Sequence, residues 1–150
     1  MKKGIRIALL VLLGILLIIA IAVPLYNNSI AAAIEKSILA VPLPPDSELA
    51  ASASSIGWQA DSDAGLQYFG AILIKSSAPQ AEIKAHYAQY SNGARSLIVS
   101  PQRSAEILAP YSTGVAFKGL AETMDFTDCY IVYAWESGNF ALKEFDYRAW

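Results

Sequence analysis

The chain has 150 residues, which is room for one domain and one membrane anchor but not for two independent cores. Hydrophobic residues make up 55% of it and the mean hydropathy is +0.37, which is more apolar than a soluble domain usually is. Residues 46–150 carry seven Lys or Arg against twelve Asp or Glu, a net charge of −5, which argues against a nucleic-acid partner and against docking on anionic lipid.

The first segment of the chain is apolar enough to span a bilayer. Every residue from Ile7 to Leu25 is apolar, and fourteen of these nineteen are Ile, Leu or Val. Nineteen residues form a helix of about 28 Å, close to the hydrocarbon thickness of a membrane. We therefore predict a transmembrane helix at 7–25 that contacts the lipid bilayer, with Pro24 in its last turn.

A cleaved signal peptide is the alternative interpretation of this segment. Lys2, Lys3 and Arg6 would form its basic start, and Ala-Ile-Ala at 20–22 fits a cleavage site. The apolar run is longer than a usual signal core and continues past that site, which favours a retained anchor. Three basic residues precede the run and Lys36 alone follows closely, so both interpretations keep the N-terminus in the cytoplasm and export the rest. The expected location is the cytoplasmic (inner) membrane, crossed once.

A helical stalk and a proline-rich spacer are predicted after the anchor. Asn-Asn-Ser at 27–29 looks like a break followed by a helix N-cap. Ile30, Ile34 and Ile38 then recur at helical spacing, followed by Val41. We interpret this face as a stalk, the alternative being a face that lies on the membrane or pairs with a partner helix. Pro-Leu-Pro-Pro at 42–45 cannot continue a helix and predicts a stiff spacer.

The next elements predicted are two strands and a helix. Ser47–Ile56 is the first expected strand, and Leu66–Ser76 is a second one with two apolar faces, as is typical of a central strand. Gly70 within it would let a neighbour approach closely or mark a bulge. A turn is expected at 61–65, and the Ser-x-Pro-Gln pattern at 77–80 predicts a helix that runs to about residue 90.

Further strands are expected at Ser96–Ser100, Arg103–Ala109 and Cys129–Trp135. A turn at 136–139 and a final strand at Phe140–Tyr147 would close a hairpin. One helix and about five or six mostly antiparallel strands predict an α+β fold, with the sheet packed on that helix.

The predicted organisation has five parts. They are a cytoplasmic leader at 1–6, the transmembrane helix at 7–25, the helical stalk at 26–41, the spacer at 42–45 and an extracytoplasmic α+β domain at 46–150.

The stretch at 67–76, with the proline-rich spacer before it and Tyr-Ile-Val-Tyr at 130–133 after it, resembles a group of small bacterial single-pass membrane proteins. The resemblance covers about half of the exported part, and its motifs are structural. In that group the turn is richer in Gly and Asn, whereas here it holds Asp61 and Asp63. The resemblance implies an anchor with an exported α+β domain, and it implies no activity, ligand or site.

Few residues offer catalytic or metal-binding chemistry. His86 is the single histidine and Cys129 the single cysteine, so no internal disulfide can form and no zinc pattern is present. Asp-Ser-Asp-Ala-Gly at 61–65 resembles the start of a calcium loop but lacks the ligands that must follow. A pair of acids for glycoside hydrolysis could come from Asp125, Asp128, Glu136, Glu144 and Asp146, which we interpret as solvated acids. We expect no cofactor, no metal and no catalytic residue.

The aromatic residues are the stronger candidates for a binding surface. The aromatic residues are many for so small a domain, and we expect most of them to pack in the core: Trp58, Trp135, Trp150, Tyr111, Tyr130, Tyr133 and Tyr147. The candidate binding surface consists of Trp58, Trp135 and Trp150. The sequence therefore predicts a binding or structural module of the cell envelope whose partner is another envelope protein or a second copy. The alternatives are a small envelope hydrolase that uses His86 or an acid pair, and a sensor of a small ligand or ion.

Overall fold

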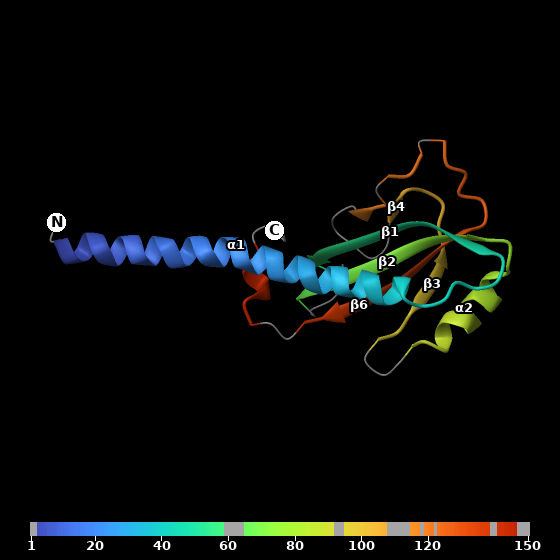
Figure 1. Cartoon of the computed structure of the whole chain (residues 1–150), viewed down its shortest axis with the longest axis horizontal. Coiled ribbons are helices and arrows are strands. Elements are labelled where there is room, and N and C mark those ends of the chain that lie inside the picture. Colours follow the sequence, from blue (N-terminus) through green and yellow to red (C-terminus); the bar gives the residue numbers. More distant parts are fainter. Residues whose placement is uncertain are drawn as a thin grey trace.

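The computed structural model describes residues 3–58, 65–91, 95–107, 115–117, 119–121, 123–138 and 141–146, except for the side chains of Trp58 and Glu144. Its most visible feature is one long helix, half of which extends away from an α+β body (Figure 1). This helix, α1, runs without interruption from Lys3 to Leu39.

The predicted α+β class is confirmed. Within the described residues, four strands form one antiparallel sheet in the order β1-β2-β6-β3, and β4 pairs with β5 in a small second sheet. The elements after α1 are β1 (Ser47–Trp58), β2 (Leu66–Ser76), α2 (Gln80–Ala88), β3 (Ile98–Pro101), β4 (Glu106–Ile107), β5 (Val115–Ala116), β6 (Cys129–Ser137) and the 3-10 helix η1 (Lys143–Phe145).

The second half of α1 covers one face of the main sheet together with α2. Ala31, Ile34 and Ile38 of α1 are buried in the same cluster as Tyr68 and Ile72 of β2. From α2 the cluster receives Ile83 and Tyr87, both without exposed surface. The helical face expected for a stalk at 26–41 therefore lies against the sheet as far as Ile38.

The opposite face of the sheet is covered by β4, β5 and the chain that follows them. Phe69, Ala71 and Leu73 alternate with the residues of β2 that face the helices, as a strand of period two requires. They pack with Ile107 and Phe117. Both faces of β2 are thus buried, which agrees with its prediction as a central strand.

Two predictions are wrong. No break occurs at 27–29, because the side chain of Asn27 is buried against the domain and hydrogen-bonded there, so it does not cap a new helix. The predicted final strand is absent from residues 141–146, which form a turn and η1. Asp146 is buried there and reaches Asn27, so this segment packs beside α1 instead of beside β6.

Candidate functional site

The three tryptophans selected from the sequence are not all described. Trp135 is half-buried on β6, with its ring centroid 5.0 Å from that of Phe69. Trp58 ends β1 with its side chain outside the described residues, and Trp150 lies outside them altogether. The Trp135 ring packs against the apolar cluster around Phe69 and Leu73 on the sheet face opposite the helices, which we call the second core. The surface of three tryptophans stays a prediction.

His86 holds the proline-rich spacer on α2. Its Nε2 donates a 2.7 Å hydrogen bond to the carbonyl of Pro42. The centroid of its ring lies 5.1 Å from that of the Tyr87 ring and 5.4 Å from that of the Tyr90 ring. The imidazole of His86 thus holds the segment between α1 and β1 in place, which is a structural role.

The acidic candidates are spread over the domain. Asp125 accepts hydrogen bonds from the backbone and hydroxyl of Thr127, which lower the pKa of its carboxyl. Glu136 forms an ion pair with Arg95, and Asp146 lies beside Asn27. Among the described residues, no group of three or more His, Cys, Asp or Glu could hold a metal ion. The turn at 61–65 is described only at Gly65.

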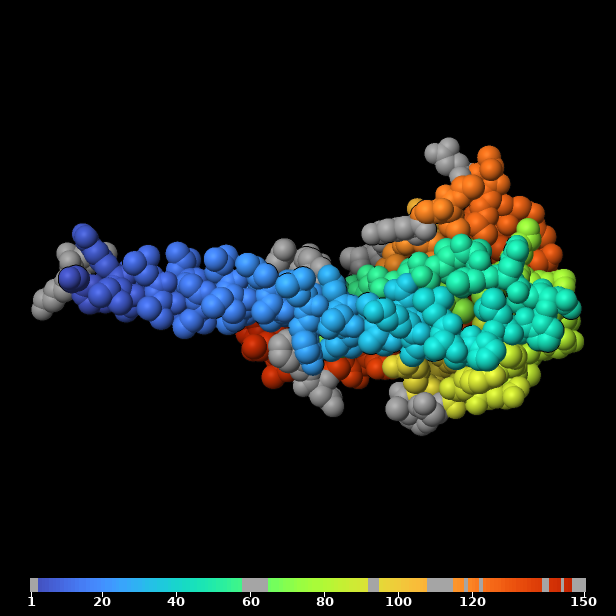
Figure 2. All heavy atoms as spheres, viewed as in Figure 1, coloured from blue at the N-terminus to red at the C-terminus, as the bar shows by residue number. Residues whose placement is uncertain are grey.

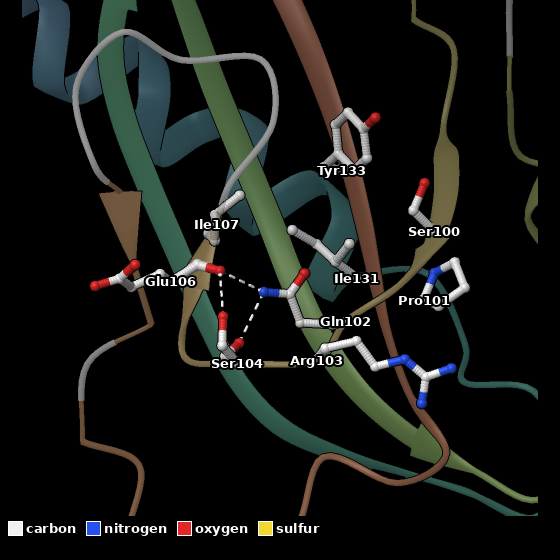
Figure 3. Close-up of a pocket in the computed structure, with 9 residues that line it drawn as sticks. All are labelled: Ser100, Pro101, Gln102, Arg103, Ser104, Glu106, Ile107, Ile131 and Tyr133. Carbon is white, nitrogen blue, oxygen red and sulfur yellow. Dashed lines mark hydrogen bonds between the residues drawn. The ribbon is translucent and has the colours of Figure 1, made fainter.

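One small pocket opens on the second face of the sheet, between the end of β3 and β4 (Figure 3). Its volume is about 190 Å³, and Ile131 and Tyr133 form its apolar floor. Gln102 shapes the wall, because its side-chain nitrogen donates to the carbonyls of Ser104 at 2.8 Å and Glu106 at 2.7 Å. A pocket of this size is below the usual range for a small-molecule site and could accept one apolar side chain.

The two edges of the main sheet differ in how far they are protected. The backbone N–H of Gln102 donates a hydrogen bond to the carbonyl of Cys129. Because alternate residues of an antiparallel strand bond to the same neighbour, the backbone groups of Val99 and Pro101 point away from β6. Proline has no N–H to offer, and the Val99 carbonyl accepts the side-chain amide of Gln80 at 3.3 Å. The β3 edge is thereby blunted against a further strand.

The β1 edge lacks this protection. The backbone N–H of Ser76 donates a hydrogen bond to the carbonyl of Asp128, so every second residue of β2 from Ser76 backwards bonds to β6 and the residues between them bond to β1. In this register the N–H and C=O groups of Ser52, Ser54 and Ile56 point away from β2. Within the described residues, no backbone hydrogen bond joins β1 to a segment other than β2. From Ala50 to Trp58 the strand has no charged residue and no proline. It is the longest strand described, and its outer backbone groups can accept another strand.

A shallow groove follows this edge. It has a volume of about 200 Å³ and is lined by Glu35, Ser52, Ala53, Ser54 and Ala116. The Ser52 hydroxyl donates to the Glu35 carboxylate, so α1 forms one wall without pairing with the strand's backbone. Figure 2 shows the teal and green chain of β1 on the surface between α1 and the orange segment that follows β5. No sequence signal marks this site, because edge position depends on the order of the strands.

The first half of α1 has a different environment from the second. α1 is the one helix of the described chain that is long and apolar enough to cross a membrane, with a window of mean hydropathy 3.2 of which 11% is buried. Its large apolar side chains from Ile5 to Ile18 are about half exposed or more, whereas burial begins at Val23.

No known protein family, curated protein or solved structure matches this chain.

Proposed function

We propose that this chain is a single-pass membrane protein of the cell envelope whose exported domain binds an extended segment of another envelope protein along β1. The observation that carries the proposal is the division of α1. One half is apolar and exposed, and the other is part of the domain's core, so that the proposed anchor continues directly into the domain that carries the β1 edge.

The exposed half of α1 supports the membrane anchor. This apolar helix surface has no partner within the described domain. Lipid could cover it without leaving any backbone polar group unpaired, because a helix satisfies these groups internally. The basic residues before it support an N-terminus in the cytoplasm. Cleavage after Ala22 would leave the buried part of α1 intact, since burial begins at Val23. The mass of the membrane-extracted protein separates retention from cleavage.

The β1 edge supports a protein partner over a small ligand. A sensor of small molecules would need a cavity between helix and sheet, where Ile83, Tyr87 and Ile72 leave no exposed surface. The pocket beside Gln102 lies on the other face and is small. Two larger hollows, of about 430 Å³ beside Asp128 and about 380 Å³ beside His86, are open to solvent and lie outside the interface of helix and sheet. The outward backbone groups of β1 offer what strand addition uses, namely main-chain donors and acceptors in regular order.

The geometry of the anchor favours a different protein over a second copy. Two β1 strands that paired antiparallel would be related by a two-fold axis perpendicular to the strands. Because β1 runs roughly along the direction of α1 (Figure 1), that axis would point the two α1 helices in opposite directions. Two such copies could not both be anchored in one membrane from the same side.

The test places a photocrosslinking residue at Ala116, which lines the groove without belonging to β1. We expect one specific protein adduct in cells, and we expect Ser54→Pro to abolish it. Proline at 54 removes an outward donor and leaves the ladder with β2 intact. The thermal midpoint of Ser54→Pro should stay near that of the unaltered protein, whereas Ala53→Pro removes an inward donor and should lower it.

An adduct that Ser54→Pro leaves unchanged would contradict binding at the β1 edge. A C-terminal tag protected from external protease in intact cells would contradict the proposed topology.

A further inference from the structure

The 3-10 helix η1 lies beside α1 at the level where α1 leaves the sheet (Figure 1). The contact is made through Asn27, whose side-chain nitrogen donates to the carbonyl of Lys143 at 3.2 Å and to the carboxylate of Asp146 at 3.1 Å. Asn27 also accepts a 2.7 Å hydrogen bond from the Tyr68 hydroxyl. These bonds fix η1 to both the helix and the sheet.

In this segment Lys143 and Asp146 turn their polar groups inward, whereas Leu142 and Phe145 are exposed. Asp146 has no exposed surface, and the Lys143 ammonium donates to the carbonyl of Leu66 at 3.1 Å. Leu142 is 39% exposed and Phe145 is 64% exposed. A segment that faces water would show the reverse order, with its charges in solvent and its phenylalanine covered.

The neighbouring turn of α1 continues this apolar surface. Leu25 is 64% exposed and Tyr26 is 48% exposed, immediately before Asn27. Tyrosine is enriched where a membrane protein meets the headgroup layer. Exposed apolar residues therefore lie on both η1 and α1 at the level of Asn27.

The position along α1 places η1 at the expected boundary of the hydrocarbon layer. Asn27 follows Leu25 by two residues, which is about 3 Å along a helix. The segment 7–25 spans about 28 Å, close to the thickness of that layer. If α1 spans the membrane, η1 stands at the interface with the headgroups.

We infer that Leu142 and Phe145 insert into the interfacial layer of the bilayer that α1 spans, so that the domain rests on the membrane at η1. This inference rests on the proposed anchor. It fixes the height of the domain: the ends of β1 and β6 near η1 face the membrane, and the opposite end, with Asp46 and Asp128, points away from it. The acidic end thereby avoids anionic lipid.

The test uses the full chain in phosphatidylcholine vesicles, with Cys129→Ala and one new cysteine labelled with an environment-sensitive fluorophore. The variants are Phe145→Cys for η1, Leu16→Cys for the middle of the span and Leu49→Cys as a control. Leu49 is 46% exposed and lies at the start of β1, at the far end of the domain. The thermal midpoint of each variant checks its fold.

Lipids that carry a nitroxide near the headgroup should quench the label at 145 at least twofold, and its emission should shift to the blue. Lipids with a nitroxide deep in the chain should quench the label at 16, and neither should quench the label at 49. Quenching at 16 without quenching at 145 would overturn the seating of η1 and leave the anchor standing. Quenching at neither would overturn the anchor itself. A blue shift at 145 without lipid quenching would mean that protein covers Phe145, which also overturns the inference.

Discussion

The backbone nitrogen of Glu35 in α1 occupies the space into which a side chain on Gly70 of β2 would project. A Cβ placed on Gly70 would overlap this nitrogen and would lie 2.8 Å from the Cγ2 of Ile34. The helix therefore crosses the central strand with its main chain in contact. This contact lets α1 lie deep enough for Ile34 and Ile38 to be fully buried, and it confirms that Gly70 permits a close approach.

Gly70→Ala should push α1 away from the sheet. The added methyl group cannot be accommodated by a side-chain rotation, because the atom it meets is backbone, so we expect the free energy of unfolding to fall by about 1–3 kcal/mol. Urea denaturation of the full-length protein in detergent, followed by tryptophan fluorescence, measures this change. Gly14→Ala is the matched control in the exposed half of α1, where a Cβ meets nothing within 4 Å. Equal stability of the two variants would contradict the contact.

Asn27→Ala should destabilise the junction of α1, β2 and η1. The variant removes the buried hydrogen bonds that Asn27 makes with the Tyr68 hydroxyl and the Asp146 carboxylate, which costs about 1–3 kcal/mol. The thermal midpoint of the full-length protein should fall accordingly. Asn28→Ala changes the neighbouring exposed residue and should have little effect. Alanine has a higher helix propensity than asparagine, so propensity alone would stabilise both variants. A drop of the same size in both would therefore contradict a specific role for the buried hydrogen bonds of Asn27.

The sequence predicted the elements whose signals are local. The bounds of β2 agree with the prediction because its apolar run lies between a turn glycine and the start of a helix. The continuity of α1 through Asn27 could not be predicted, since the partners of this side chain lie 41 and 119 residues away. β5 has two residues, too few to form a pattern. The alternating apolar and polar residues at 140–147 are typical of a strand. Nothing in this local pattern shows that the Asp146 carboxylate accepts a hydrogen bond from Asn27 of α1.

The candidate binding edge was beyond sequence reasoning for a related reason. β1 is an edge strand because β2 has β6, more than fifty residues later, as its other neighbour. Pairing over such a distance leaves no mark within β1, whose Ala and Ser residues indicate only a weak strand. The anchor, by contrast, depends on one continuous apolar run and could be proposed from the sequence alone.

Tyr87→Phe should stabilise the protein. The Tyr87 side chain has no exposed surface, and its hydroxyl has no hydrogen-bond partner among the described residues. Removing an unpaired buried hydroxyl should raise the free energy of unfolding by about 1 kcal/mol. Tyr90→Phe, at a residue that is 43% exposed, is the control and should be neutral. A less stable Tyr87→Phe variant would show that the hydroxyl has a partner after all.

The same substitution should change the dependence of stability on pH. Burial raises the pKa of Tyr87 from 10.0 to about 12 in the folded protein. Between these values the unfolded chain loses a proton that the folded protein keeps, so stability falls as pH rises from 10 to 12. Tyr87→Phe has no phenol to ionise, so its stability does not fall in this way. The difference in free energy of unfolding between the variant and the unaltered protein should therefore be larger at pH 11 than at pH 9. Urea denaturation at the two pH values measures the difference, and an unchanged advantage would contradict the raised pKa.

Cys129 should react with alkylating reagents only when the domain opens. The side chain is 3% exposed, its Sγ lies 3.7 Å from the carbonyl of Asp125, and burial raises the pKa of the thiol. A thiol that is both covered and protonated is a poor nucleophile. If opening costs about 3 kcal/mol, iodoacetamide at pH 8 should modify the folded protein at least about a hundredfold more slowly than the protein in urea. Mass spectrometry over time gives both rates, and Ser77→Cys in a Cys129→Ala background supplies an exposed thiol for comparison. A folded-state rate for Cys129 equal to that of the thiol at 77 would mean that the second core is open to solvent at this end of β6.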